Sequence, residues 1–310
     1  SQTTALRRHY GWAWYQRKVT LPTFCAGQRV VLRFGSVTHT AKVWLNGQLI
    51  AQHKGGFTPF EADVTALLHP GETVLLTVAC DNRVNHSTLP VGNEDGQLAF
   101  FGSDNAGIPS VEAAKRAAAP QNRPNFDFFN YAGIHRPVWL YTTPKEYIED
   151  VTIVPAVDGT VQYAVKTTGS APVHVTVLDA DGNAVASAEG AEGTITIPEV
   201  HLWEPRPGTP YLYTLHITCG ADVYDQTFGV RSIEVRGTQV LLNGKPLYFK
   251  GFCKHEDFTA HGRGFDPVLN VKDVNLIHWA NANAVRTSHY PYAEEFYDLC
   301  DREGILVMDE

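Results

Sequence analysis

Residues able to do chemistry gather where three short apolar runs end, between Gly251 and Glu310. The runs lead into His255, His289 and Glu310, with a helix-length segment between neighbouring runs. Alternating strands and helices at this spacing predict βαβ units and a parallel sheet. In a closed α/β barrel the carboxyl ends of the strands meet at one face, where binding and catalytic side chains lie. We therefore expect these side chains, which can bind hydroxyl groups or transfer protons, at the mouth of a barrel.

The segments between these runs predict the helices that position them. The first helix is expected from about Asn270 to Trp279, with Asn270 as its amino-terminal cap. Its apolar face would consist of Val271, Val274 and Ile277. The second helix is expected from about Ala293 to Arg302. Gly304 follows it and suits the left-handed residue that commonly ends a helix.

The preceding residues predict two all-β units. Residues 12–143 hold runs rich in β-branched and aromatic residues, and Asn46-Gly47 between two such runs favours a two-residue hairpin. Residues 146–236 alternate with period two, which is typical of an immunoglobulin-like sandwich, and show no enriched chemistry. Between Val84 and Asn125 the strand pattern fails, apart from one short helix that residues 111–119 could form.

Composition excludes several classes of protein. The formal net charge of -8 disfavours a nucleic-acid binder, because such proteins need clustered Lys and Arg to neutralise phosphates. The sequence has no apolar run long enough to span a membrane, so we expect no membrane partner. Five cysteines without a CxxC spacing argue against a disulfide framework and predict a reduced, cytoplasmic setting.

Four segments resemble family 2 glycoside hydrolases: Phe57–Thr65, Asp127–Arg136, Gly251–Asp257 and Arg286–Glu295. The resemblance covers nearly the whole chain. It implies a jelly-roll sugar-binding-like domain over 1–145, incomplete at its start, and an immunoglobulin-like β-sandwich over 146–236. Residues 237–310 would then be the first three β/α units of a catalytic (β/α)8 TIM barrel. The expected fold class is therefore multidomain, with two β-sandwiches followed by the start of a barrel.

The resemblance also implies an activity, namely retaining hydrolysis that releases terminal β-D-glucuronate from a small-molecule glycoside without a cofactor. The two catalytic glutamates are expected beyond residue 310, so no catalytic residue is expected within the chain. Two alternatives stay open: a β-galactosidase or β-galacturonidase of the same family, and a carbohydrate-binding module without catalysis. We also expect a homo-oligomer.

By the same resemblance, Asp127 and His289 contact sugar hydroxyls, and His255 either lines the pocket or supports it. A carboxylate accepts strong hydrogen bonds from hydroxyls, and an imidazole can bind them with either nitrogen. The alternatives are structural: Asp127 as an ordinary turn residue and His289 as a packed loop histidine.

Other side chains have competing interpretations. Glu256 or Asp257 with Glu310 is a possible pair of catalytic carboxylates, which retaining enzymes hold about 5–5.5 Å apart, although the same acids could instead orient histidines or line the pocket. Arg286 is either a carboxylate anchor or a structural ion-pair partner. A metal held by His255, Asp257 and His289 is a further alternative, but no short ligand spacing supports it. Aromatic residues that could stack on a sugar or pack in the core are Phe126, Phe128, Phe129 and Tyr131.

Overall fold

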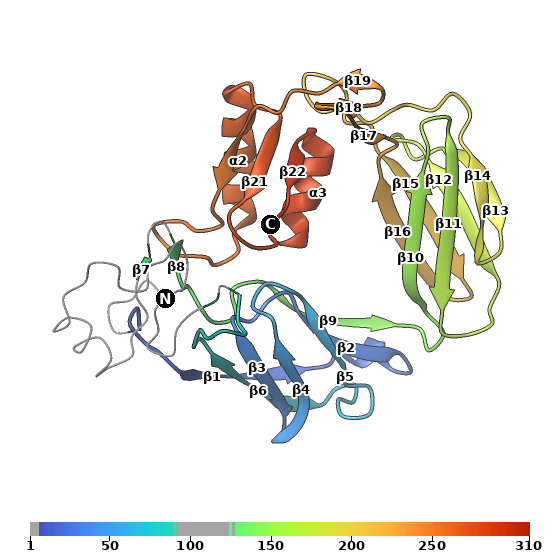
Figure 1. Cartoon of the computed structure of the whole chain (residues 1–310). Helices are drawn as coiled ribbons and strands as arrows, with labels where there is room; N and C mark the ends of the chain where they lie inside the picture. Colours follow the sequence, from blue (N-terminus) through green and yellow to red (C-terminus); the bar gives the residue numbers. More distant parts are fainter. Residues whose placement is uncertain (1–5, 90, 92–123, 126–127) are drawn as a thin grey trace, which may run out of the picture. The chain divides into compact units, whose positions relative to one another are not determined.

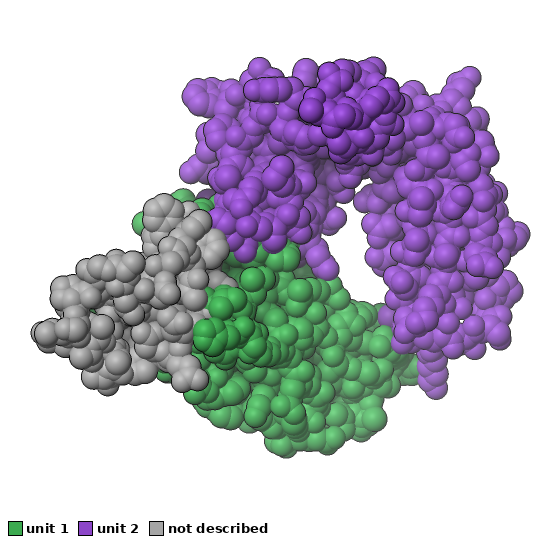
Figure 2. All heavy atoms as spheres, in the orientation of Figure 1, with its two compact units in different colours: residues 1–142, 255–265, 290–293 green, residues 143–254, 266–289, 294–310 purple. Residues whose placement is uncertain are grey.

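The computed structural model describes residues 6–89, 91, 124–125 and 128–310. The chain divides into two compact units (Figure 2). Unit 1 contains residues 1–142, 255–265 and 290–293, and unit 2 contains residues 143–254, 266–289 and 294–310. Two short segments from late in the chain therefore pack with the amino-terminal strands. This division follows contacts, so the predicted domain boundaries after residues 145 and 236 stay a prediction. In the part of the chain that is described, no helix is long and apolar enough to cross a membrane.

Unit 1 is built on two sheets (Figure 1). The first has the order β1 (Trp12–Thr20), β6 (Thr73–Asp81), β3 (Thr40–Leu45) and β4 (Gln48–Lys54), and the second β5 (Phe60–Asp63), β2 (Arg29–Phe34) and β9 (Val138–Thr143). A 3-10 turn, η1 (Thr23–Cys25), and two short strands, β7 (Pro124–Asn125) and β8 (Phe128–Phe129), complete its regular structure. The predicted hairpin is confirmed, because Asn46 and Gly47 have φ of 46° and 85° between β3 and β4.

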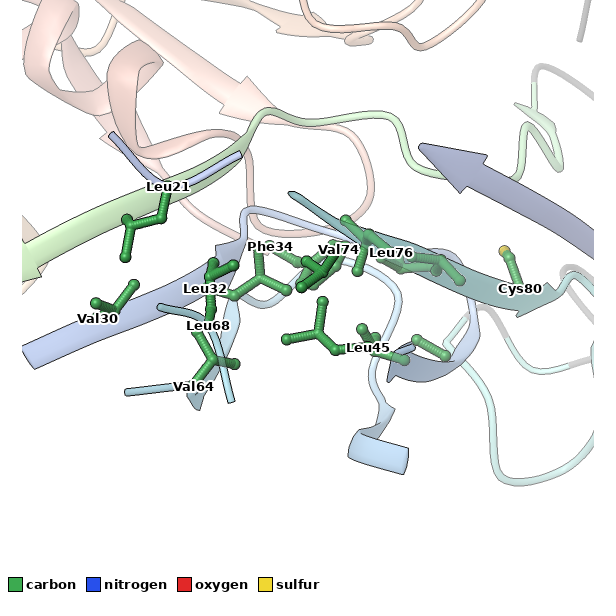
Figure 3. Packing of buried hydrophobic residues seen from close by; sticks show 14 of the residues in the cluster. Leu21, Val30, Leu32, Phe34, Leu45, Val64, Leu68, Val74, Leu76 and Cys80 are labelled. Carbon is green, nitrogen blue, oxygen red and sulfur yellow. The ribbon is translucent and has the colours of Figure 1, made fainter. Parts of the chain in front are cut away.

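Alternation along the strands places apolar side chains in the interior of unit 1. In β3 every second residue is buried, so Ala41, Val43 and Leu45 face the core. Phe34 from β2 stacks on Phe60 from β5 with ring centroids 4.9 Å apart. Figure 3 shows leucine and valine side chains from several strands packed together in this core. Burial of this apolar surface is the main force that holds the strands together.

Beside this apolar core, unit 1 also buries two histidines. The His39 Nε2 atom lies 2.7 Å from Asn130 Oδ1. The His135 ring lies between two hydroxyls, with Nε2 3.0 Å from Ser36 Oγ and Nδ1 2.9 Å from Thr38 Oγ1. Burial lowers the pKa of His39 to about 4 and lowers the pKa of His135 well below its ordinary value. Both imidazoles are therefore neutral near neutral pH.

Unit 2 begins with a second pair of antiparallel sheets (Figure 1). One contains β10 (Ile148–Pro155), β11 (Thr160–Thr167) and β14 (Glu192–Thr196), and the other β13 (Ala184–Glu189), β12 (Val173–Leu178), β15 (Tyr213–Cys219) and β16 (Asp222–Phe228). Strands β12 and β15 show strict alternation of buried and partly exposed residues, which confirms the period-two prediction for this region.

The carboxyl-terminal part of unit 2 contains the predicted parallel strands. A small antiparallel sheet of β17 (Ile233–Arg236), β18 (Gln239–Leu242) and β19 (Lys245–Pro246) precedes them. Strands β20 (Gly251–Lys254), β21 (Ala284–Thr287) and β22 (Leu306–Met308) then pair in parallel and in sequence order. Helices α2 (Pro267–Trp279) and α3 (Glu294–Glu303) connect them (Figure 1). The βαβ prediction is confirmed, and only the start of a barrel is present.

The predicted cap of α2 is wrong. Asp266, not Asn270, precedes the helix in extended conformation, and its carboxylate accepts hydrogen bonds from the amides of Val268 and Leu269 at 2.9 and 3.3 Å. Pro267 occupies the first helical turn, where a missing N–H costs nothing. Asn270 lies one turn further on and donates its own amide to the Asp266 carbonyl at 3.2 Å, so it belongs to the helix interior.

The predicted apolar face of α2 is correct at two of its three positions. Val274 and Ile277 are buried at 2% and 6% exposure, whereas Val271 is 48% exposed. Helix α3 agrees with its prediction to within one residue at each end, and Gly304 after it has a φ of 70°. A β-carbon would be strained at that backbone conformation, which is why glycine ends the helix.

The cap on α2 gives the first testable prediction. Asp266→Ala removes the acceptor for two helix amides and should lower the free energy of unfolding by about 1 kcal/mol. Hydrogen exchange should accelerate at Val268 and Leu269 in the whole protein, because these amides lose their partner. Asp266→Asn keeps an acceptor and serves as the control. Unchanged exchange in Asp266→Ala would contradict this assignment.

The buried imidazoles give a prediction on pH. The folded pKa of His39 is about 4, below its ordinary value of 6.5, so the unfolded state binds more protons between these values. Stability should therefore be complete above about pH 6.5 and fall as the pH decreases toward 4, by roughly 2 kcal/mol between about pH 7 and pH 5 for this histidine alone. His135, whose pKa is also lowered, should add to the loss.

Denaturant titrations of the whole protein at several pH values would measure this dependence. His39→Gln should give a flatter pH profile whatever its stability at neutral pH, whereas the exposed His69 should leave the profile unchanged when replaced by Gln. Parallel profiles for the His39 variant and the wild type would rule out the assignment.

Candidate functional site

The ends of the parallel strands in unit 2 carry polar side chains. Arg286 in β21 forms an ion pair with Glu310, which follows β22. Its guanidinium also lies 3.7 Å from the Cys253 sulfur of β20. Of the two interpretations for Arg286, the structural ion pair is the one observed. Glu310 is likewise bound to a neighbouring strand end.

A second set of hydrogen bonds fixes the end of β21. Asp309 Oδ1 accepts from the Thr287 hydroxyl at 2.9 Å and from the Tyr297 hydroxyl at 2.6 Å. The Thr287 oxygen in turn accepts from the amide of Glu310 at 3.0 Å. Thr287 is fully buried, and His289 follows two residues later with a half-buried side chain. The strand that leads to His289 is thus held firmly at its carboxyl end.

In unit 1, the segments 255–265 and 290–293 pack on residues of the amino-terminal sandwich. These segments follow β20 and β21 in the sequence, so each is the loop that continues a barrel strand. Two arginines, Arg136 and Arg263, make most of the polar contacts described for these loops. Both are buried, at 6% and 4% exposure. A guanidinium stays charged in proteins, so its burial requires compensating partners.

Arg136 connects the sandwich to both loops. Its guanidinium donates to the carbonyls of Phe57 at 2.8 Å and Pro291 at 2.6 Å, and it forms an ion pair with Glu256 at 3.2 Å. The other Glu256 oxygen accepts from the amide of Ala293 at 2.9 Å. Since the side chains of Arg136 and Glu256 are 5% and 9% exposed, little water competes for these bonds.

These bonds give Glu256 a role that the sequence pattern did not indicate. Each of its carboxylate oxygens is bound, one to a guanidinium and the other to a backbone amide. The side chain therefore joins the two loops rather than standing ready as a proton donor or nucleophile. Asp257, the next residue, is half-buried.

Arg263 is surrounded by aromatic rings. Its guanidinium carbon lies 4.4 Å from the ring centroid of Tyr290, 5.2 Å from that of Phe57 and 5.9 Å from that of Tyr131. The same group approaches the carbonyls of Phe129 at 3.4 Å and Tyr131 at 3.5 Å. Cation–π attraction strengthens when the cation is removed from water, as it is here.

The predicted site residues have different positions. His255 and His289 are both half-buried, His255 in unit 1 and His289 in unit 2. Asp127 and Phe126 lie outside the described residues, as does the side chain of Phe128. Phe129 is buried and packs edge-on against Tyr131 at 4.7 Å, so core packing is the observed role for Phe129. Within the described ranges, no group of three His, Cys, Asp or Glu side chains is arranged to hold a metal.

Sequence reasoning missed Arg136, Arg263 and Tyr290 as organising residues. Arg136 ends a segment singled out as Asp127–Arg136, and Tyr290 lies in the segment Arg286–Glu295, so part of the signal was present. Arg263 lies in neither segment, and only the spatial contacts described above identify it.

Comparisons with known proteins place this chain among carbohydrate-active enzymes. Residues 2–144 match the model for the glycosyl hydrolases family 2 sugar binding domain. Residues 146–231 match the model named glycosyl hydrolases family 2, and residues 233–310 match the family 2 TIM barrel domain.

Individual relatives are similar over the whole chain. A β-glucuronidase of Paenibacillus borealis is 43% identical over 321 aligned positions, which cover 100% of this chain and 51% of that protein. The structure of a Faecalibacterium prausnitzii β-glucuronidase is 97% identical with a TM-score of 0.94, covering 100% of this chain and 52% of that one. A Bifidobacterium dentium β-glucuronidase complexed with coumarin-3-O-glucuronide is 51% identical with a TM-score of 0.91, covering 100% and 54%.

The chain therefore spans about half the length of the relatives it matches. The three family models follow one another along it from residue 2 to residue 310, in the order in which the folded segments occur. The parallel strands β20 to β22 fall within the part matched by the barrel model. By this nearly complete coverage, the chain belongs to glycosyl hydrolases family 2.

Proposed function

We propose that the whole protein carrying this chain is a retaining β-glucuronidase, which releases terminal β-D-glucuronate from small glucuronides. The observation that carries this proposal is the 97% identity to a β-glucuronidase of known structure over the full chain. A second relative, 51% identical, is complexed with a glucuronide, which supports the same class of substrate. The rivals are a β-galactosidase or β-galacturonidase of the family and a carbohydrate-binding module without catalysis.

In this proposal the residues of the chain bind the sugar rather than cleave it. Asp127 and His289 hydrogen-bond its hydroxyls, and His255 lines or supports the same pocket. The firm end of β21, with Thr287 bonded to Asp309 and to the amide of Glu310, supports the assignment of His289. The two catalytic glutamates that a retaining mechanism requires are expected outside residues 1–310.

Three further features belong to the proposal. The domains are a jelly roll over 1–145, an immunoglobulin-like sandwich over 146–236 and the start of a TIM barrel over 237–310, supported by the ranges of the family models. A cytoplasmic location is supported by five cysteines, all of them free thiols. A homo-oligomer is supported by large exposed apolar side chains such as Trp14 and Trp139, 64% and 50% exposed.

Substrate preference tests the activity. The whole protein should hydrolyse p-nitrophenyl β-D-glucuronide, with kcat/KM roughly 100-fold or more above that for the β-D-galactoside, because a site that binds a carboxylate is left unpaired by a neutral sugar. The β-D-galacturonide should also be slower, and NMR should detect the β-anomer of the product first. Faster cleavage of the galactoside or galacturonide would favour the rival enzymes. Sugar binding without cleavage would favour the module.

The role of His289 gives a separate prediction. His289→Ala should lower kcat/KM for the glucuronide about 10- to 100-fold, the effect of losing one or two hydrogen bonds to the bound sugar. Its melting midpoint should stay close to that of the wild type, because the side chain is only half-buried. His69→Ala, a change at an exposed histidine of the sandwich, is the matched control. Near-normal kinetics in His289→Ala would reject the assignment.

A further inference from the structure

We propose that Arg263 is a positioning residue that holds in register the two segments leading from Asp127 and from His289. The inference rests on the proposed function, in which these two residues bind the same sugar. Arg263 contacts neither segment's sugar-binding residue in the proposal. It acts through the residues that follow them, Phe129 and Tyr131 on one side and Tyr290 on the other.

The contact toward His289 is made through an aromatic stack. Tyr290, bonded directly to His289 in the chain, is 1% exposed and stacks on Phe57 with ring centroids 4.2 Å apart. The Arg263 guanidinium lies over both rings, nearest to Tyr290 at 4.4 Å. Movement of the cation would therefore disturb a ring whose backbone continues into His289.

The contact toward Asp127 is made through backbone carbonyls. Arg263 Nη2 donates to the carbonyl of Phe129 at 3.4 Å, and Nη1 donates to that of Tyr131 at 3.5 Å. Phe129 comes two residues after Asp127 in the sequence. Both nitrogens of one planar group thus bind the stretch that follows Asp127, which limits how far this stretch can shift.

The residue before Arg263 allows this close approach. Gly262 has a φ of +68°, and a β-carbon there would lie 2.8 Å from the ring of Tyr131. Only glycine fits this position without displacing the ring. The local sequence Gly262-Arg263 therefore brings the cation against Tyr131 and its carbonyl.

The chemistry of the contacts requires arginine in particular. A guanidinium is planar and stacks on rings while donating from two nitrogens, whereas a lysine ammonium is a compact charge with neither property. Arg263→Lys therefore keeps the charge but loses the paired donation and the flat stacking surface. Arg136, by contrast, binds Glu256 and Pro291 and so joins the two loops to each other.

A double-mutant cycle on the whole protein distinguishes positioning from general support. Arg263→Lys alone should lower kcat/KM for p-nitrophenyl β-D-glucuronide about 10-fold or more. In the His289→Ala background the same change should lower it less than about threefold further, because a misplaced side chain has already been removed. Arg231→Lys, at an exposed arginine that lies 5.3 Å from the Trp203 ring, is the matched control and should leave kcat/KM unchanged in both backgrounds.

Several outcomes would overturn the inference. A folded Arg263→Lys with wild-type kinetics would do so, and so would losses from Arg263→Lys and His289→Ala that simply multiply. If Arg263→Lys does not fold, Tyr131→Leu replaces it in the same cycle, because it removes a stacked ring and leaves the cation. A wild-type protein that cleaves no glucuronide would instead refute the proposed function, so the two failures are distinguishable.

Discussion

Two buried guanidinium groups govern how the loops after the first two barrel strands pack. Arg136 and Arg263 cannot lose their charge, so each needs carbonyls, a carboxylate or aromatic faces around it. Arg136 finds them in Phe57, Pro291 and Glu256, and Arg263 finds them mainly in rings. Neither loop can leave its place without exposing these partners or leaving a buried cation uncompensated. Segments that would otherwise be mobile loops therefore behave as part of the core of unit 1.

The same cations affect the buried histidines. Burial is the largest cause of the lowered pKa of His39 and His135, and the positive charge of Arg263 lowers both further. A neutral imidazole can donate from one nitrogen and accept at the other, which suits His135 between the hydroxyls of Ser36 and Thr38. The interior of unit 1 thus holds its charge on arginine and keeps its histidines as neutral hydrogen-bonding groups.

Local signals in the sequence predicted most of the fold. Asn46-Gly47 gave a hairpin and Gly304 ended a helix, because positive φ at these positions is a property of the residues themselves. The cap of α2 was misassigned to Asn270 since apolar periodicity was given more weight than Asp266-Pro267, a pair that suits a helix start by itself. Val271 was expected on the buried face, but burial depends on what covers a helix as well as on its own spacing.

The candidate site was harder to predict, because its organisation depends on contacts between distant residues. The bonds of Arg136 join residues 120 and 155 positions apart, and no local pattern encodes such a distance. For Arg286 the strand-end position was enough to suggest an ion pair, since Glu310 ends the neighbouring strand. For Glu256 the same reasoning suggested pocket chemistry, although both of its oxygens are bound to the protein.

The proposed sugar contacts share one structural property, namely that fixed residues lie close to them in the chain. His289 lies between Thr287 and Tyr290, which are 0% and 1% exposed. Phe129 and Asn130, soon after Asp127, are buried at 8% and 2%. A binding side chain needs to be held to within a fraction of an ångström, and a loop achieves this only when its neighbours are packed or hydrogen-bonded. Anchoring of the flanking residues, by the Thr287–Asp309 bond for one segment and by the arginines for both, is therefore how this fold combines loop-borne chemistry with precise placement.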